Sequence, residues 1–406
     1  MKKNFVFKTA AAATLCLTVT AGALLPARAL AWDWLSAGAA VFQVGAQYAY
    51  LNRQIHYLDN KGRNQHMAQI KDKYGVNQDP AANAMLDRIM GRLSDAIALS
   101  DPSITKKPYN YFVNNEKSFN AFCTVGHNLS VNIGTFDKLN YNENEIAFVV
   151  AHEIGHGQKQ HPAAGVKRGL PLSLLAALYS SQNPNAASII GATLVNALGT
   201  ARLVTLPMEK EADRLAFDYA VAAGYNVGGG AALWQHILER NGKESSGFAS
   251  VFNDHPTSVS RRDEYSRRIT KWSGNAVKVE KDTGAITVQG KHFYTPAKTT
   301  SLSSAEQAYL IAGNLAAVYH NKANSRTVWT NGAHMLMVGD QPIMTLNGVA
   351  NAATVQRRLQ DILQDKKVQT AKVQDKKVQT AKVQTAKVQT KAAAEKKSDS
   401  KKGRLD

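Results

Sequence analysis

Apolar residues recur with a helical period over much of the first 272 residues. Residues 32–104 read as helical, and within them residues 82–99 place apolar side chains on one face of a helix. A second periodic stretch covers residues 143–160 and is preceded by Asn140 and Asn142, which are suitable N-cap residues. Its apolar positions are Ile146, Phe148, Val149, Val150, Ala151 and Ile154. The pattern therefore predicts a long helix with one side in the core.

Two short segments between these helices have strand character. Residues 109–113 and 129–133 are rich in aromatic and β-branched side chains, and a polar turn at 114–117 follows the first of them. They predict a small antiparallel sheet beside the helices.

Residues 170–203 are unusually apolar and are divided by a polar segment at 180–184. The run at 170–178 would span only about 14 Å as a helix, which is too short to cross a bilayer. Two interpretations remain open. The segment is either a hairpin that covers a functional site or dips into a membrane surface, or a buried hairpin that packs on the 143–160 helix. We favour the buried hairpin.

From residue 276 the pattern changes to short strands and separate helices. Two strands flank a turn at Gly284, and a later helix has Ser303 or Ser304 as its cap with Glu306 close by. The strands are expected at 277–280, 285–288, 327–329 and 335–338, and the helices at 304–320 and 352–363. The pattern predicts a small α+β module over residues 273–364, in which we find no catalytic constellation.

The N-terminus has the form of an export signal. Lys2, Lys3 and Lys8 precede an apolar run at 9–25, and residues 29–31 are an A-x-A cleavage site. A membrane anchor is the alternative, but the run has only about 17 residues, with Thr and Gly among them. We therefore expect residues 1–31 to be a signal peptide and the protein to be exported, to the periplasm, the cell envelope or the medium.

Cleavage of that signal would leave a single cysteine. The chain has two, Cys16 within the signal and Cys123. An intramolecular disulfide is then excluded, so the core and any bound metal must stabilise the exported protein.

The C-terminal residues 365–406 repeat a basic, low-complexity unit. Valines recur there every five residues, which builds no apolar stripe on a helix, so this tail is expected to be disordered. The signal carries +4 and the tail +8 of the formal net charge of +18, which leaves +6 for residues 32–364. The tail is either attracted to an anionic envelope surface or serves as a solvated spacer, and export argues against nucleic acid as a partner.

The 143–160 helix carries an H-E-x-x-H motif at His152, Glu153 and His156. Residues four apart lie about 40° apart around a helix, so both imidazoles can reach one Zn²⁺. Glu153 is offset by about 100°, close enough to touch a metal-bound water without ligating the metal. The alternative is that the motif occurs by chance. Its position on a helix with a periodic apolar face argues against a chance match.

A catalytic zinc usually has three protein ligands, and the best third candidate is Glu209. Asp213 lies one turn later on the same face and suits a role in orienting a ligating histidine, whereas Glu211 faces elsewhere. A solvated acidic helix face would be the ordinary explanation of this cluster taken alone. His161 is half a turn out of phase with His152, so we expect it to point away from the metal, at the surface or at the end of the helix.

With these residues the chain resembles the zinc metallopeptidase family that includes the CAAX prenyl endopeptidase, HtpX and the periplasmic protease BepA. The resemblance runs from about residue 77 to residue 268. It rests on Asn120-Ala121-Phe122, residues 145–156, residues 209–213, residues 223–226, and His255-Pro256-Thr257 followed by Arg261.

The resemblance implies a role for each matched residue. His152, His156 and Glu209 would bind zinc, and Glu153 would be the catalytic base in peptide hydrolysis. His255 matches a family histidine that can approach the metal. It would donate to the oxyanion, close the resting site as a fourth ligand, or be a plain turn residue before a proline.

The expected fold class is α+β. A mainly helical zincin (gluzincin-like) peptidase domain with a small antiparallel sheet would cover residues 32–272, an α+β accessory domain residues 273–364, and the disordered tail residues 365–406. In zincins an edge strand above the metal holds the substrate extended, and the 129–133 segment is our candidate for that strand, with a plain structural strand as the alternative.

The sequence thus predicts an exported zinc endopeptidase that acts on unfolded or misassembled envelope proteins, in protein quality control. Polypeptides would be its substrates, and the sequence does not determine an oligomeric state. The rival interpretations are a non-proteolytic envelope chaperone or scaffold and a cell-surface protein that binds through its basic tail. Structural zinc sites are closed and rich in cysteine, which favours the enzyme here.

Overall fold

A computed structural model describes residues 30–197, 204–240 and 258–365, with side chains from residue 42 onward. The signal peptide, the basic tail and His255 lie almost entirely outside these residues, so the expectations for them stay predictions. The chain divides into two compact units, Met1–Tyr50 and Leu51–Asp406. The second unit contains every residue of the predicted metal group.

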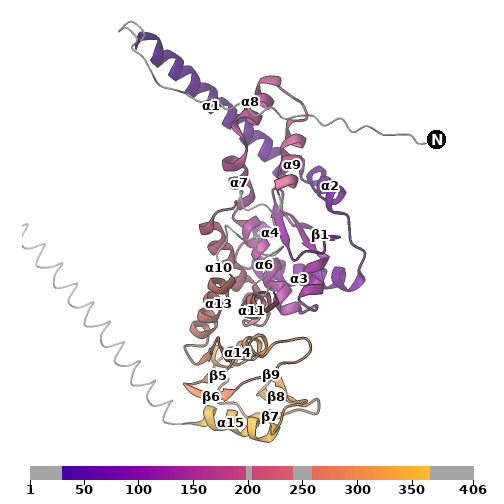
Figure 1. Ribbon diagram of the computed structural model, residues 1–406, viewed down its shortest axis with the longest axis vertical. Coiled ribbons are helices and arrows are strands. Elements are labelled where there is room, and N and C mark those ends of the chain that lie inside the picture. The colour runs from indigo at the N-terminus through magenta and orange to yellow at the C-terminus, as the bar shows by residue number, and fades with distance from the viewer. Residues whose placement is uncertain (1–29, 198–203, 241–257, 366–406) are drawn as a thin grey trace, which may run out of the picture. The chain divides into compact units, whose positions relative to one another are not determined.

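The N-terminal part is helical, as the sequence predicted (Figure 1). Its helices are α1 Leu30–Asp59, α2 Arg63–Tyr74, α3 Pro80–Ala98 and α4 Ser103–Lys106. The side chain of Asp79 caps α3 by accepting a hydrogen bond from the Ala82 N–H, and Pro80 begins the first turn. The buried face of α3 is the predicted one and includes Met85, Leu86, Ile89, Met90, Leu93 and Ile97. No described helix is both long enough and apolar enough to span a membrane.

A three-stranded sheet follows, with β1 Asn110–Asn114, β2 Ala121–Thr124 and β3 Asn128–Asn132. Its order is β1-β3-β2. β2 pairs with β3 antiparallel as expected, but β1 pairs with β3 in parallel, so the sheet is mixed. The sequence did not reveal β2, a four-residue strand that lies between the two predicted strands along the chain.

The prediction that residues 129–133 form the edge strand that holds the substrate was therefore wrong. It corresponds to β3, which lies in the centre of the sheet with both edges paired, so it has no free edge to offer a peptide. β2 is an edge strand and packs against α6.

Helices form the rest of this region: α5 Ile133–Lys138, α6 Glu143–Gln158, α7 His161–Gly169, α8 Leu172–Ser181, α9 Ala186–Ala197, α10 Leu206–Ala222, α11 Gly229–Arg240 and α13 Ser258–Trp272. α6 carries the H-E-x-x-H motif and contacts α3, α10, α11 and β2 (Figure 1). Most of its residues are buried, so the motif lies on a core helix.

The apolar segment 170–203 contains α8 and α9, with residues 198–203 outside the described part. α9 packs on α2, where Gln69 donates to the Ser188 carbonyl and Lys73 to the Val195 carbonyl. The sequence predicted packing on the motif helix instead. α2 offers α9 both these polar side chains and an apolar surface, where Met67 and Ile70 share a buried cluster with Val195.

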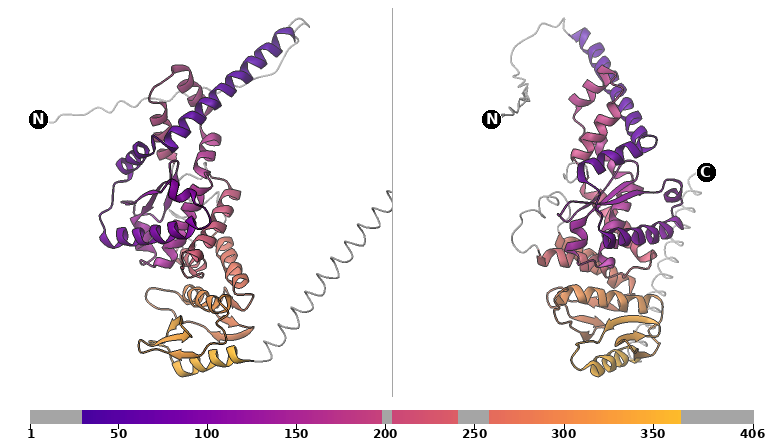
Figure 2. Two further views of the ribbon diagram at one scale, coloured as in Figure 1. Left: turned by 180° about the vertical axis from the view of Figure 1, so that it is seen from behind. Right: turned by 90° about the vertical axis from the view of Figure 1, so that its right-hand side faces the viewer.

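The C-terminal module contains two antiparallel three-stranded sheets and two helices. Its elements are β4 Val277–Val279, β5 Ile286–Val288, β6 Lys291–Tyr294, α14 Ser304–His320, β7 Val328–Thr330, β8 Met335–Val338, β9 Gln341–Thr345 and α15 Ala352–Gln364. The predicted elements are present, and β6 and β9 are additional. The strands lie between α14 and α15 (Figure 2). α14 contributes to the core of this module and, through Tyr309 and Ala316, to the main helical core.

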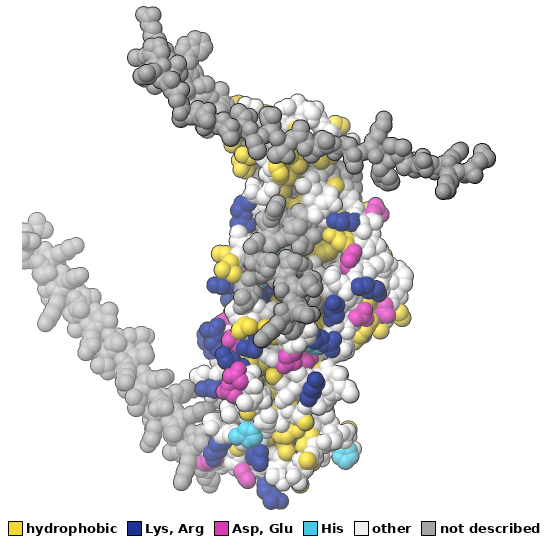
Figure 3. Space-filling model, in the orientation of Figure 1, with side chains coloured by type: hydrophobic (Ala, Val, Ile, Leu, Met, Phe, Trp, Pro, Cys, Tyr) yellow, Lys and Arg dark blue, Asp and Glu magenta, His cyan; other side chains and the backbone are white. Residues whose placement is uncertain are grey.

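Charges of both signs are interspersed on the surface over α10 and α13 (Figure 3). Arg214 pairs with Asp218 on α10, and Arg268 with Glu264 on α13, at 3.5 and 3.0 Å. Exposed ion pairs of this kind contribute little to stability. The mixture of positive and negative side chains agrees with the modest net charge of residues 32–364.

Candidate metal centre

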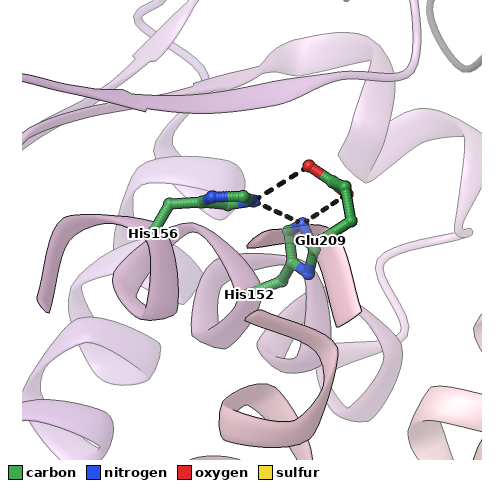
Figure 4. A group of neighbouring side chains, drawn as sticks. All are labelled: His152, His156 and Glu209. Atoms are coloured by element: carbon green, nitrogen blue, oxygen red, sulfur yellow. Dashed lines mark hydrogen bonds and ion pairs between the residues drawn. The ribbon is translucent and has the colours of Figure 1, made fainter. Parts of the chain in front are cut away.

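Three ligand-type atoms converge between α6 and α10 (Figure 4). His152 Nε2 lies 3.0 Å from His156 Nε2. The Glu209 carboxylate approaches both imidazoles, with Oε2 3.4 Å from His152 Nε2 and Oε1 3.2 Å from His156 Nε2. The three residues are only 9%, 5% and 2% exposed. We call this set the metal group.

Glu209 reaches the two histidines because α10 approaches α6 very closely. A Cβ atom on Gly155, between the two histidines, would lie 3.3 Å from Cα of Ala212 on α10. Such a contact is tighter than ordinary packing, so a side chain at this position would force the helices apart. The glycine in the motif thus helps to bring the carboxylate across to the imidazoles.

Asp213 contacts His152 on the side of the imidazole that faces away from the metal group. Nδ1 of His152 lies 3.0 Å from Asp213 Oδ1. Arg261 donates to both Asp213 oxygens, through Nε at 2.8 Å and through Nη2, and its guanidinium lies 3.8 Å from the centre of the Trp234 ring. Burial raises the pKa of Asp213, but the charges of Arg261 and His152 outweigh it and hold that pKa below its usual value. Arg261 Nη2 also lies 3.1 Å from His152 Nδ1, but it donates to Asp213. The ionised carboxylate is an acceptor only, so the Nδ1 proton of His152 is directed to Asp213.

His161 contacts His156 on the side away from the metal group and lies just past the end of α6, as predicted, but it is buried and not at the surface. Its Nδ1 lies 2.9 Å from Nδ1 of His156. An angle counted along one helix does not account for its burial, because the helix ends before this residue. Gln160 has a left-handed backbone, with φ of 52°, and His161 and Pro162 open a new helix, α7. The proline was the sequence signal that could have revealed the break.

The metal group has the chemistry of a cation site. Both histidines direct Nδ1 outward, to Asp213 and to His161, and so present Nε2 toward each other and toward a carboxylate. Burial lowers the pKa of His152, yet Asp213 and Glu209 outweigh it and raise that pKa to about 9. The group therefore attracts positive charge. A proton can bridge only two of the three atoms, whereas a metal ion can satisfy all three, so the residues fit a metal.

Glu153 lies beside the metal group and is held by the edge strand. The backbone N–H of Cys123 on β2 donates to Glu153 Oε2 at 2.9 Å. Burial raises the pKa of Glu153 to about 7, close to the value that suits a general base near neutral pH. This contact also places the outer edge of β2 at the Glu153 carboxylate.

Sequence reasoning missed three contributors to this site: the Arg261 pair with Asp213, the His161 contact and the Cys123 N–H. Arg261 was noted only within a matched segment. The arginine comes from 48 residues beyond Asp213, and the N–H is a backbone group, so neither has a local sequence signature.

Comparison with known proteins agrees with this geometry. Residues 80–269 match the model of peptidase family M48. The metalloprotease LoiP of Escherichia coli (strain K12) is 27% identical over 248 residues, covering 58% of this chain and 87% of LoiP. The metalloprotease YcaL of the same organism is 24% identical over 195 residues, covering 48% of this chain and 74% of YcaL.

A longer relative is the beta-barrel assembly-enhancing protease of Escherichia coli (strain K12). It is 25% identical over 295 residues, which cover 70% of this chain and 55% of that protein. The chain therefore spans about half the length of this relative. The matched region contains the metal group, Glu153 and Arg261, and the relatives are named as proteases. Residues 80–269 accordingly match a peptidase family M48 domain, and the similarity to named metalloproteases supports a metalloendopeptidase.

Proposed function

We propose that the protein is a zinc-dependent endopeptidase in which His152, His156 and Glu209 hold the metal and Glu153 is the general base. The observation that carries the proposal is the convergence of two imidazole Nε2 atoms and one carboxylate in a buried group. Two histidines and one glutamate are a common ligand set of catalytic zinc, which keeps one coordination position for water or substrate.

The bound zinc would supply Lewis acidity, polarising the scissile carbonyl and making the attacking water more acidic. Glu153 then takes the proton from that water and delivers it to the leaving amine. Its Oε2 is fixed by the Cys123 N–H, which leaves Oε1 to accept the proton. A pKa of about 7 lets the same carboxyl group accept and release a proton near neutral pH.

We further propose that the substrate lies extended along β2. This strand pairs only with β3 among the described strands, and its outer edge carries the N–H that reaches Glu153. A peptide added to this edge would pass the catalytic carboxylate. Extended segments are readily available in unfolded proteins, so this geometry suits unfolded substrates.

The compartment and the natural substrates are proposed from other features. The signal-type N-terminus supports export to the periplasm or envelope, and one relative is named for enhancing beta-barrel assembly. Misassembled envelope proteins are therefore the proposed substrates, in protein quality control.

His255 is proposed to approach the metal group, as the family resemblance implies. If it stabilises the oxyanion, His255→Ala lowers turnover by roughly 10²-fold, as expected for the loss of one such donor. If it closes the resting site as a fourth ligand, the same variant has higher basal turnover. The measurement is turnover of an unfolded protein at matched zinc occupancy, and unchanged turnover would leave His255 as a turn residue.

The experiment that tests the proposed function uses the mature chain from Trp32 and an unfolded protein such as casein. We expect internal cleavage that a chelator abolishes and that stoichiometric zinc restores. Metal analysis of the purified protein should give one zinc per chain. Cleavage that persists after complete zinc removal, or no cleavage by the zinc-loaded chain, would refute the proposal.

A further inference from the structure

We infer that His161 and Glu211 form an outer hydrogen-bond relay that fixes the orientation and tautomer of the zinc ligand His156, with His161 as a positioning residue. The inference rests on the proposed zinc site, and it concerns two side chains outside the metal group. His161 would not touch the metal or the substrate. Its effect would pass through His156.

The geometry forms a continuous path from His156 to the surface. Nδ1 of His156 lies 2.9 Å from Nδ1 of His161, and the two rings meet edge to face, at an interplanar angle of 71°. Nε2 of His161 lies 3.4 Å from Oε2 of Glu211. His161 is only 4% exposed, whereas the Glu211 side chain is 39% exposed. The relay therefore begins in the buried group and ends in solvent.

The direction of the hydrogen bonds follows from the ligand role of His156. An imidazole that offers the Nε2 lone pair to a metal carries its proton on Nδ1, so His156 must donate to His161 Nδ1. His161 then carries its proton on Nε2 and donates it to the Glu211 carboxylate. The other tautomer of His161 would oppose two N–H groups and turn a lone pair toward a carboxylate, so one tautomer of each ring fits the path.

The chain is built to hold His161 in this place. Gln160 adopts a left-handed backbone conformation, with φ of 52°, which reverses the chain after α6. Pro162 then fixes the first turn of α7, so His161 is at the rigid start of that helix. On α10, Glu211 turns away from the metal group and toward α7, whereas Glu209 turns into the group.

Each of the two histidine ligands thus donates a hydrogen bond from Nδ1, but the acceptors differ. His152 donates directly to Asp213, which is buried and paired with Arg261. His156 reaches a carboxylate only through a second imidazole. Partners of this outer kind typically change metal affinity by about 10- to 100-fold when they are removed.

The alternative is that His161 merely fills space between α6 and α7. A phenyl ring would fill that space as well, but it cannot accept a hydrogen bond. Asparagine can place its Oδ1 near the position of the histidine Nδ1 and so retain the acceptor. The two substitutions therefore separate packing from hydrogen bonding.

The experiment compares the mature chain with His161→Phe, His161→Asn and Glu211→Met, the last of which removes the acceptor of His161 at similar side-chain length. Zinc affinity is measured by competition with a chromophoric chelator, and Co²⁺-loaded samples give a visible spectrum that reports ligand orientation. Glu143→Gln is the matched control, because Glu143 is an acidic residue of α6 that pairs with Arg88 and makes no contact with the relay. Thermal melting of the metal-free proteins checks the fold.

We expect His161→Phe to weaken zinc binding by about 10- to 100-fold and to shift the Co²⁺ spectrum, while the metal-free melting temperature stays close to that of the parent. His161→Asn should recover most of the affinity, Glu211→Met should lose less affinity than His161→Phe, and Glu143→Gln should match the parent. Parent-like zinc affinity and a parent-like Co²⁺ spectrum in His161→Phe would overturn the relay but not the proposed zinc site. If that variant does not fold, parent-like affinity in Glu211→Met overturns the relay. A parent chain that binds no zinc refutes the proposed function itself.

Discussion

At the scale of single residues, the proposed catalysis depends on what surrounds each carboxylate. Glu153, Glu209 and Asp213 all lie within the same site, yet their partners differ. Glu153 accepts from a backbone N–H, Glu209 approaches two imidazole nitrogens, and Asp213 pairs with Arg261. Their proposed roles as base, ligand and support follow from these partners, because the three side chains carry the same functional group.

The role of Glu153 predicts a loss of hydrolysis without a loss of metal. Glu153→Gln should lower kcat/KM by at least ~10²-fold, because an amide cannot take up the proton of the attacking water. Zinc content should stay at the parent level, since the three ligands are unchanged. Glu143→Gln is the matched control on the same helix, where Glu143 pairs with Arg88 at the surface. Near-parent turnover in Glu153→Gln would contradict the base assignment.

The buried pair of Arg261 and Asp213 predicts an asymmetric response to mutation. Arg261→Met should lower the free energy of unfolding by about 3–5 kcal/mol, because it leaves the Asp213 carboxylate buried without its cation. The double variant Arg261→Met/Asp213→Leu should recover part of that loss. Urea unfolding of the metal-free proteins measures both changes. A double variant that is as unstable as the sum of the two single changes would argue against the pairing.

At the scale of elements, the metal group depends on the close approach of α6 and α10. Gly155→Ala should destabilise the protein by about 1–3 kcal/mol, because the added Cβ meets the α10 backbone at Ala212. It should also weaken zinc binding, since Glu209 moves away with α10. Calorimetry and chelator competition measure the two effects.

Gly91 on α3 provides the control for this prediction. A Cβ atom there has no neighbour within 4 Å. Gly91→Ala should therefore leave zinc binding unchanged and stabilise the helix by roughly 0.5–1 kcal/mol. Equal behaviour of the two glycine variants would show that the approach of the helices is not tight at Gly155.

At the scale of the whole molecule, a second buried cluster joins α6 to the C-terminal module. His236 of α11 lies 2.7 Å from Glu306 of α14 and 3.3 Å from Glu145 of α6. All three residues are buried. Glu306 also completes the capping box of α14 with Ser303, so the same side chain begins that helix and contacts His236. Folding thus brings two carboxylates against one imidazole.

This cluster predicts that stability falls at alkaline pH. Burial lowers the pKa of His236, but hydrogen bonds to Glu145 and Glu306 outweigh it and raise that pKa to about 9. Burial raises the pKa of Glu145 to about 8. Both folded-state pKa values exceed the unfolded ones, so the folded protein holds more protons. The stabilisation is complete below the unfolded pKa values, about 4.5 for Glu145 and about 6.5 for His236. It is lost as the pH rises through the folded values, about 8 for Glu145 and about 9 for His236.

The measurement is the free energy of unfolding in urea at pH 6.5 and pH 9.5. Glu306→Gln should reduce the alkaline loss by on the order of 2 kcal/mol relative to the parent, because His236 then has one carboxylate fewer to raise its pKa. Groups elsewhere titrate equally in both proteins, so the difference isolates the cluster. Identical pH profiles would contradict the role of Glu306.

The sequence by itself determined the parts of the protein that depend on local signals. The Ser303–Glu306 capping box defined α14, and the apolar face of α3 was visible in its helical period. The H-E-x-x-H spacing placed His152 and His156 on one face of a helix, because that relation depends on helix geometry alone. Strands β2, β6 and β9 were not predicted, since short strands depend on their neighbours more than on their own residues.

The tertiary structure decided everything that joins distant segments. It placed His161 against His156. The first helix ends between these two residues, so an angle counted along one continuous helix does not predict where His161 lies. The tertiary structure also put β2 at the sheet edge beside Glu153, and it brought Arg261 to Asp213. Glu145, His236 and Glu306 meet from three helices and have no common pattern in the sequence. Packing selects these contacts through space, so no spacing along the chain could have specified them.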